Sequence, residues 1–240
     1  MNKYLKGIGV FAGGWIVAML FFALLGNFDN LNIFLIDTFI PAVFLGIIGF
    51  ILSLFQKEIR PSKKSFPILP LIILVIIDQG LKQYLFTLDW SSIYITIIKP
   101  SFYFQPVQNT HGSYLASLLN LNIPKFLYFI LYIIVGFVVI KGYRFYTLNR
   151  GKSIWSKSFI ILFVSGIICV AIDNGFRGGT LDYILINPLY TFDIKDIYLT
   201  MSVLCFIIEL WNENLLFNHK MSKEEEKKLM KDFRKFLFKE

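Results

Sequence analysis

Residues 165–196 read S-G-I-I-C-V-A-I-D-N-G-F-R-G-G-T-L-D-Y-I-L-I-N-P-L-Y-T-F-D-I-K-D. This stretch places four aspartates between two long hydrophobic runs, namely Asp173, Asp182, Asp193 and Asp196. Placing an acidic side chain in or beside a membrane segment costs free energy. Acids at such positions therefore suggest a functional role by default. The alternative is an ordinary polar loop outside the membrane, whose acids serve solubility. Composition alone leaves both interpretations open.

The composition is that of an integral membrane protein. The chain has 240 residues, 56% of them hydrophobic, whereas globular domains average about 45–50% apolar residues. The two cysteines, Cys169 and Cys205, lie inside apolar runs, and the two histidines are isolated. These residues indicate neither a disulfide framework nor a metal site, and we expect no metal and no cofactor. The first apolar run has spanning length and no small-residue cleavage site, so it is interpreted as a retained helix.

Hydrophobic runs and basic residues together predict a topology. A spanning helix needs about 20 mostly apolar residues. Six segments qualify or nearly do: 6–25, 33–55, 67–87, 125–146, 157–174 and 196–217. Of the 24 Lys and Arg residues, all but five fall on one side of these spans, which places both termini in the cytoplasm by the positive-inside rule. The net charge of +8 is therefore expected to face membrane phospholipids, not nucleic acid.

Two further segments have patterns of their own. Within residues 88–124, S-S-I-Y-I-T-I-I and S-F-Y-F-Q-P-V predict two short strands, followed by a turn and a short helix that ends at Pro124. The tail, residues 218–240, opens with Ser222-x-x-Glu225, a capping signature, and predicts a basic amphipathic helix on the inner leaflet. The expected fold is an all-α polytopic membrane protein of about six transmembrane helices with a small extracytoplasmic β-strand subdomain.

Four short motifs occur in an order that resembles signal peptidase II, the lipoprotein signal peptidase family. They are I-I-D-Q-G-L-K at the end of the third span, V-Q-N-T-H-G-S-Y after the outer strands, S-G-I-I-C-V-A-I-D-N followed by G-G-T-L-D-Y-I, and T-F-D-I-K-D-I. The resemblance covers residues 67–217, including the outer β subdomain at 88–124. Residues 1–66, two additional helices with a basic loop, have no counterpart in the family's four-helix core.

The resemblance implies an aspartic endopeptidase of a bacterial plasma membrane. Such an enzyme cleaves the signal peptide of diacylglyceryl-modified pro-lipoproteins at the outer leaflet, and we expect it to be a monomer whose active site faces outward. The catalytic pair implied is Asp182 and Asp196. The substrate-binding or supporting residues implied are Asp78, Lys82, Asn109, Asp173, Arg177 and Asp193.

The chain also departs from the family's pattern. In the family's Gly-Asn-x-x-Asp-Arg, the asparagine is Val170 here and the arginine is Asn174, for which Arg177 is a candidate substitute. In Phe-Asn-x-Ala-Asp, an acid, Asp193, replaces the amide, and a cation, Lys195, replaces the small residue. These changes imply a divergent member. The alternative function is a non-catalytic lipid- or lipoprotein-binding membrane scaffold on the same fold.

Two facing carboxylates have a chemistry of their own. They share one proton and titrate as a pair, so one can activate a water while the other protonates the carbonyl oxygen and then the leaving amine. The spacing of Asp182 and Asp196 suits such a pair, with one acid from a strand in a loop and the other from the first turn of the last span. The helix dipole favours the ionised form of Asp196, which is our expected base.

Two alternatives remain open at this point. Asp193, Lys195 and Asp196 could form only a helix N-cap with an ion pair. A small transporter or proton channel could use the carboxylates as relay sites. The transport alternative is disfavoured because the acids lie at the outer ends of the spans, with Glu209 the other acid within reach.

Overall fold

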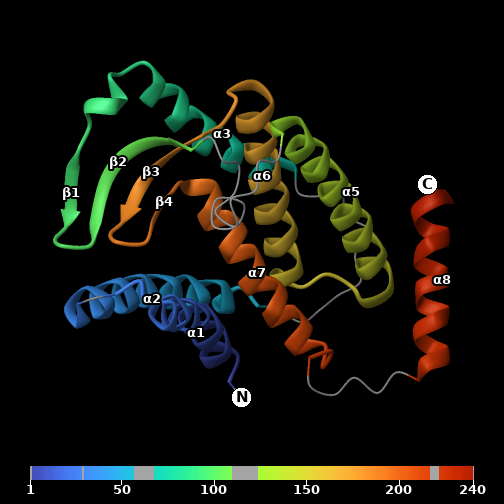
Figure 1. The fold of residues 1–240 in the computed structure, drawn as a ribbon. Coiled ribbons are helices and arrows are strands. Elements are labelled where there is room, and N and C mark those ends of the chain that lie inside the picture. Colours follow the sequence, from blue (N-terminus) through green and yellow to red (C-terminus); the bar gives the residue numbers. More distant parts are fainter. Residues whose placement is uncertain (1, 29, 57–67, 110–123, 217–221, 240) are drawn as a thin grey trace.

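The computed structural model in Figure 1 describes residues 2–28, 30–56, 68–109, 124–216 and 222–239. The predicted turn and short helix after Asn109 lie outside these residues. The helices of the described chain are α1 (Lys3–Leu24), α2 (Leu31–Leu54), α3 (Ile68–Phe86), the 3-10 turn η1 (Trp90–Ser92), α5 (Lys125–Arg150), α6 (Ile154–Phe176), α7 (Ile194–Asn212) and α8 (Lys223–Lys239). Helix α6 is central, because it contacts α3, α5 and α7.

Five of the described helices are long and apolar enough to cross a membrane: α1, α2, α3, α5 and α6. Helix α7 has 19 residues and occupies the place of the sixth predicted span, but it carries three charged residues, Lys195, Asp196 and Glu209. Large apolar side chains such as Leu69 and Phe126, each 69% exposed, point away from the protein, as expected of helices surrounded by lipid. The chain is a multi-pass membrane protein.

The strands form one antiparallel sheet in the order β1-β2-β3-β4. Strands β1 (Ile95–Ile98) and β2 (Phe102–Asn109) confirm the two strands predicted before α5. Strands β3 (Thr180–Ile186) and β4 (Tyr190–Phe192) come from the connection between α6 and α7, so the sheet is larger than predicted. Figure 1 shows the sheet lying beyond the end of the helices at which α7 begins.

The pairing of β2 with β3 positions the site. Its register runs from Phe102 opposite Ile186 to Asn109 opposite Thr180, with an irregularity between Phe104 and Val107. Thr180 begins β3 immediately after the turn at the end of α6. The end of β2 is thereby held beside the start of β3, so their side chains meet close to the membrane helices.

The first two helices pack on each other and then on the core. A Cβ atom added at Gly7 of α1 would lie 2.5 Å from the carbonyl oxygen of Gly49 in α2; small residues of this kind allow close helix approach in membranes. Phe11 of α1 joins Trp155 of α6 and Ile208 of α7 in one fully buried apolar cluster. The pair α1–α2 is therefore an integral part of the packed protein.

Polar contacts at the other end of the helices join α1 and α5 to the end of α7. Lys6 donates to Asn212 (2.7 Å), and Arg150 pairs with Glu213 (3.2 Å). Helix α8 begins with the predicted capping box, in which the N–H groups of Ser222 and Glu225 each donate to the other's side chain. Phe233 and Phe236 of α8 pack on Phe145 of α5, with ring centroids 5.3 and 5.6 Å apart. Part of the apolar face of α8 thus packs on α5, whereas Leu229 and Met230 of that face stay exposed.

Candidate active site

The start of α7 is capped by two of the predicted site residues. Asp193 is the N-cap and Asp196 the third helical residue. The N–H of Asp196 donates to Oδ1 of Asp193 (3.3 Å), and the N–H of Asp193 donates to Oδ2 of Asp196 (3.2 Å). This capping box satisfies two backbone donors that a helix leaves unpaired. The alternative of a helix cap with an ion pair is therefore present in the structure, although it does not exclude a catalytic role for Asp196.

Asp182 projects from β3 toward this helix start. Its Oδ1 accepts a hydrogen bond from the hydroxyl of Thr180 (2.6 Å), and its Oδ2 accepts one from Nδ2 of Asn109 (3.0 Å). The second contact depends on the β2–β3 register, which sets Asn109 opposite Thr180. Two donors from neighbouring strands thus fix the orientation of the Asp182 carboxylate.

The structure brings the predicted pair together with a third acid. Asp182, Asp193 and Asp196 each offer a carboxylate oxygen, and these oxygens lie within 4.8 Å of one another, close enough to share one cation. The side chain of Asp196 is 42% exposed, whereas those of Asp182 and Asp193 are almost fully buried. Asp196 is therefore the member of the group that water and a substrate can reach most easily.

Lys195 lies against all three carboxylates. Its Nζ atom is 2.6 Å from Oδ2 of Asp193, 3.5 Å from Oδ1 of Asp182 and 3.6 Å from Oδ2 of Asp196, and it also donates to the Thr180 hydroxyl at 3.0 Å. Sequence reasoning noted Lys195 as a departure from the family's pattern and as a member of a possible ion pair, but did not count it among the site residues. The replacement of a small residue by a cation was the signal that it belongs to the site.

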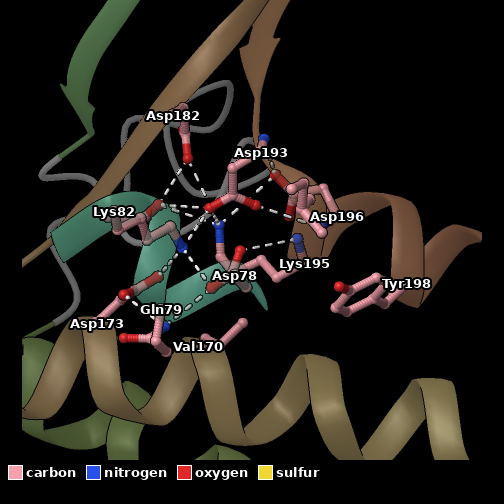
Figure 2. Close-up of polar contacts among 12 residues, drawn as sticks. Asp78, Gln79, Lys82, Val170, Asp173, Asp182, Asp193, Lys195, Asp196 and Tyr198 are labelled. Atoms are coloured by element: carbon pink, nitrogen blue, oxygen red, sulfur yellow. Dashed lines mark hydrogen bonds and ion pairs between the residues drawn. The ribbon is translucent and has the colours of Figure 1, made fainter. Parts of the chain in front are cut away.

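A second buried lysine supports the group from α3 (Figure 2). The Nζ of Lys82 lies 3.0 Å from Asp78, 2.6 Å from Asp173 and 2.6 Å from Asp193, and all four side chains are fully buried. The predicted contact between Asp78 and Lys82 across one helical turn is thus present, but Lys82 also binds acids of α6 and of the α7 cap. It ties three separate segments together beneath the Asp182–Asp196 pair.

Asp173 is held by an arginine, Arg177, which lies four residues later and not directly after the aspartate as in the family's pattern. Arg177 lies 3.1 Å from Oδ1 of Asp173 and also donates to Oε1 of Gln79 (2.8 Å). Gln79 in turn donates to Asp173 (3.2 Å). Asn174, at the family's arginine position, instead turns its amide back to the carbonyl of Val170 (3.0 Å). Gln79 was missed by sequence reasoning, because nothing in the pattern of α3 shows that it faces α6.

The charge state of Asp193 follows from its neighbours. Burial disfavours its ionised form, but the ammonium groups of Lys195 and Lys82 outweigh burial and lower its pKa below the ordinary value of 3.8. Oδ2 of Asp193 contacts both ammonium groups at 2.6 Å. Asp193 is therefore an ionised bridge between the two lysines, whereas the family's pattern has a neutral amide at this position.

A cavity of about 290 Å³ lies beside Asp196. Its lining comes from the two additional helices, the sheet and α7, and is apolar except near Asp196 and Thr200: Trp15, Ile40, Pro41, Phe44, Leu45, Phe102, Ile186, Tyr190, Phe192, Asp196, Ile197 and Thr200. Ligand sites are mostly apolar hollows with a few convergent polar groups. The cavity is therefore a candidate site for the apolar part of a substrate.

One wall of this cavity is held by an unusual helix contact. Pro41 has no N–H, so the carbonyl of Asp37 has no helical donor four residues on. The indole Nε1 of Trp15 in α1 donates to that carbonyl at 2.9 Å. Trp15 and Pro41 both line the cavity. The hydrogen bond that replaces the missing helical one therefore lies at the cavity wall.

Comparisons with known proteins identify the family of this chain. Residues 70–212 match the family described as signal peptidase (SPase) II. Two curated proteins named lipoprotein signal peptidase, from Streptococcus thermophilus strains CNRZ 1066 and ATCC BAA-250 / LMG 18311, are each 34% identical over 85 residues, which cover 34% of this chain and 56% of the relative. The chain thus spans little more than half the length of the curated relatives it matches.

Two solved structures share the fold. Both are bacterial membrane enzyme structures obtained by the in meso method, at 2.3 and 1.9 Å resolution. The first is 20% identical, with a TM-score of 0.51 over 70% of this chain and 100% of the other; the second is 22% identical, with a TM-score of 0.51 over 64% and 97%. Because the family match extends over more than half of the chain and includes α3, α5, α6, α7 and the whole sheet, the protein belongs to the signal peptidase II family.

Proposed function

We propose that this chain is a lipoprotein signal peptidase that cleaves diacylglyceryl-modified pro-lipoproteins with the Asp182–Asp196 pair. The observation that carries the proposal is the meeting of these two acids from separate elements, with Asp182 oriented by Asn109 and Thr180 and Asp196 open to the cavity. Family membership supports the same reaction. The two named relatives are lipoprotein signal peptidases.

The proposed reaction is hydrolysis by a water held between the two carboxylates. One carboxylate removes a proton from the water as it attacks the scissile carbonyl carbon, and the other gives a proton first to the carbonyl oxygen. A hydroxyl of the resulting tetrahedral intermediate returns its proton to the pair as the carbonyl re-forms, the pair gives a proton to the leaving amine, and the carbon–nitrogen bond breaks, so the two carboxylates again share one proton. Asp196 is the more accessible of the two acids, which favours it as the residue that meets the water. The order of the roles, with Asp196 as base, stays a prediction.

The substrate's apolar part would occupy the cavity beside Asp196. Its walls combine α1 and α2 with α7 and the sheet, so an acyl chain placed there would end near the pair. The peptide would lie extended against the sheet. The basic ends of the helices lie at the opposite end from the site, which supports cytoplasmic termini and an active site at the outer leaflet. The proposal needs only one copy of the chain.

The direct test uses purified protein in lipid nanodiscs with a lipidated pro-lipoprotein. The parent should release the signal peptide, and Asp182→Asn and Asp196→Asn should each abolish release while keeping the thermal unfolding temperature close to that of the parent. Asp89→Asn, which removes an acid before η1 and away from the pair, is the matched control and should cleave like the parent. Cleavage that survives either active-site substitution overturns the assignment of the pair.

A non-catalytic scaffold is the second candidate, and Lys195 is the observation that favours it. An ammonium within 3.6 Å of both acids changes the charge of the pair from that of the family's pattern. A folded parent that binds the lipidated precursor but leaves it intact, across several precursors and pH values, would select this candidate. Transport is disfavoured by geometry, since Asp196 and Glu209 are separated along α7 by roughly 20 Å at 1.5 Å per residue, with mostly apolar residues between them.

A further inference from the structure

Lys195 occupies the centre of the carboxylate group. Its side chain is 4% exposed, and its Nζ atom lies within 3.6 Å of an oxygen of each of the three acids. Among the described residues, Lys82 also reaches Asp193, but only Lys195 contacts Asp182 and Asp196 as well. In Figure 2 the Lys195 side chain extends from the first turn of α7 among these acids.

The surroundings of Lys195 are strongly acidic. The titratable or charged groups that act on it or respond to it come from four segments: Asp182 and Tyr183 of β3, Asp193 and Asp196 at the start of α7, Lys82 of α3 and Tyr132 of α5. Like charges held this close cannot all stay ionised without a compensating cation. Buried charges likewise persist only when they are paired.

We propose that Lys195 is a built-in counter-cation and a positioning residue for the Asp182–Asp196 pair. The ammonium stands where the three carboxylates would otherwise take up an external cation or a further proton, beyond the one that the Asp182–Asp196 pair shares in the proposed reaction. It keeps Asp182 and Asp196 close together in spite of the extra acid at Asp193. Only its catalytic consequence rests on the proposed function; the electrostatic role is a property of the fold itself.

The pairing of two changes supports this inference. Relative to the family's pattern, this chain gains a negative charge at Asp193 and a positive charge at Lys195, two residues apart. The two side chains contact each other at 2.6 Å. The negative charge of Asp193 is thus balanced by the positive charge of Lys195, so the two departures from the family's pattern compensate each other.

The first test measures thermal unfolding of the full chain in nanodiscs. Lys195→Met keeps the apolar stem and removes the charge, and Lys195→Ala also leaves space. Both variants should unfold several degrees below the parent at pH 7, and the deficit should shrink toward pH 5, where protons on the carboxylates replace the ammonium. Lys157→Ala, which removes an exposed lysine of α6, is the control and should match the parent at both pH values.

An added cation gives the second measurement. Carboxylate oxygens bind Ca²⁺ readily, so millimolar CaCl₂ should raise the unfolding temperature of Lys195→Ala but not that of the parent or of Lys157→Ala, compared with NaCl at equal ionic strength. Asp193→Asn in the Lys195→Ala background should abolish the gain. A Lys195→Met variant as stable as the parent, with the same pH dependence, would refute the proposal, as would a parent stabilised by CaCl₂ to the same extent.

Cleavage assays then separate this proposal from the proposed function. If the parent cleaves, loss of the ammonium makes the carboxylates harder to ionise, so the acidic limb of the Lys195→Met pH–rate profile should move to higher pH. An unchanged profile would refute the catalytic consequence. If the parent does not cleave, the proposed function fails, whereas the thermal measurements still decide the role of Lys195.

Discussion

The backbone N–H of Asp196 donates to the carboxylate of Asp193, and the N–H of Asp193 donates back to the carboxylate of Asp196. The acid proposed to meet the water is thus also part of the cap of α7. A capping box pairs two backbone N–H groups that the helix start leaves free, so the Asp196 carboxylate is held by the N–H of Asp193. The Asp196 side chain therefore has both a capping role and a proposed catalytic role, and substitutions must be chosen that affect one role without the other.

Asp196→Asn and Asp196→Ala should separate the proposed catalytic role of Asp196 from its role in the helix cap. Asparagine keeps an oxygen that can accept the N–H of Asp193, so cleavage should be lost with little change in stability. Alanine removes the acceptor as well, and losing a cap contact costs about 0.5–2 kcal/mol. Chemical unfolding in detergent and the cleavage assay measure the two effects. Equal destabilisation by both substitutions would contradict the proposed separation. Ser222→Ala, in the capping box of α8, is the control for a cap remote from the site.

Asn109 should act through Asp182. Its amide donates to Oδ2 of Asp182 at 3.0 Å, and a hydrogen bond to a charged group is worth about 1.5–3 kcal/mol. If that contact is made fully only in the transition state, Asn109→Ala should lower kcat by roughly 10- to 100-fold at that energy. The neighbouring Gln108 is exposed, so Gln108→Ala should retain the parent rate in the same assay. If Asn109→Ala kept the parent's kcat, the proposed role of Asn109 in positioning Asp182 would be contradicted.

Lys82 should be essential for folding more than for chemistry alone. It is fully buried and pairs with Asp78, Asp173 and Asp193, and removing one partner of a buried ion pair typically costs about 3–5 kcal/mol. Lys82→Met should therefore lower the unfolding free energy by about that amount. Adding Asp78→Asn to Lys82→Met should recover part of the loss, because one uncompensated charge is removed with it. If the double variant lost as much unfolding free energy as the two single variants together, Lys82 and Asp78 would contribute independently.

Sequence motifs located the acids of the site because acids stand out in an apolar chain. Asp182 was expected from a strand in a loop and Asp196 from a helix start, and the structure places them so. The β2–β3 pairing was not predicted, because β-branched patterns show that a strand exists but not which distant strand it joins. The same limit explains Gln79, whose contact with Asp173 depends on how α3 packs on α6.

The additional helices show another limit of sequence reasoning. Hydropathy predicted α1 and α2 as spans, but apolar faces do not reveal which other helix they cover. Phe11 of α1 packs with Trp155 and Ile208, and α2 supplies four of the residues that line the cavity beside Asp196, namely Ile40, Pro41, Phe44 and Leu45. Helix α7, predicted as the sixth span, is not among the five described helices that are apolar enough to cross a membrane, because it carries Lys195, Asp196 and Glu209. Hydropathy does not show that Lys195 and Glu209 are buried beside polar partners.

The pH dependence of stability should report Asp193. Its folded-state pKa is lowered below 3.8 by the two lysines, after burial has opposed ionisation. A lowered pKa contributes stability that is fully present above the unfolded value and is lost as pH falls through the folded value. The unfolding temperature of the parent should therefore drop below about pH 4, and Asp193→Asn should start lower at pH 7 and drop less. Parallel curves for parent and variant between pH 3 and 6 would contradict this assignment.

Filling the cavity should weaken substrate binding and spare the chemical step. Ile40 of α2 lines the cavity beside Asp196 but contributes no polar group to the pair. In Ile40→Trp the larger side chain would occupy space proposed for an acyl chain, so KM for the lipidated substrate should rise several-fold with kcat nearly unchanged, the pattern of lost uniform binding. Leu54→Trp adds the same bulk to the last residue of α2, which is 51% exposed and outside the cavity lining, and should leave both constants as in the parent. An unchanged KM in Ile40→Trp would place the lipid elsewhere, whereas equal effects of both substitutions would point to a general disturbance of α2.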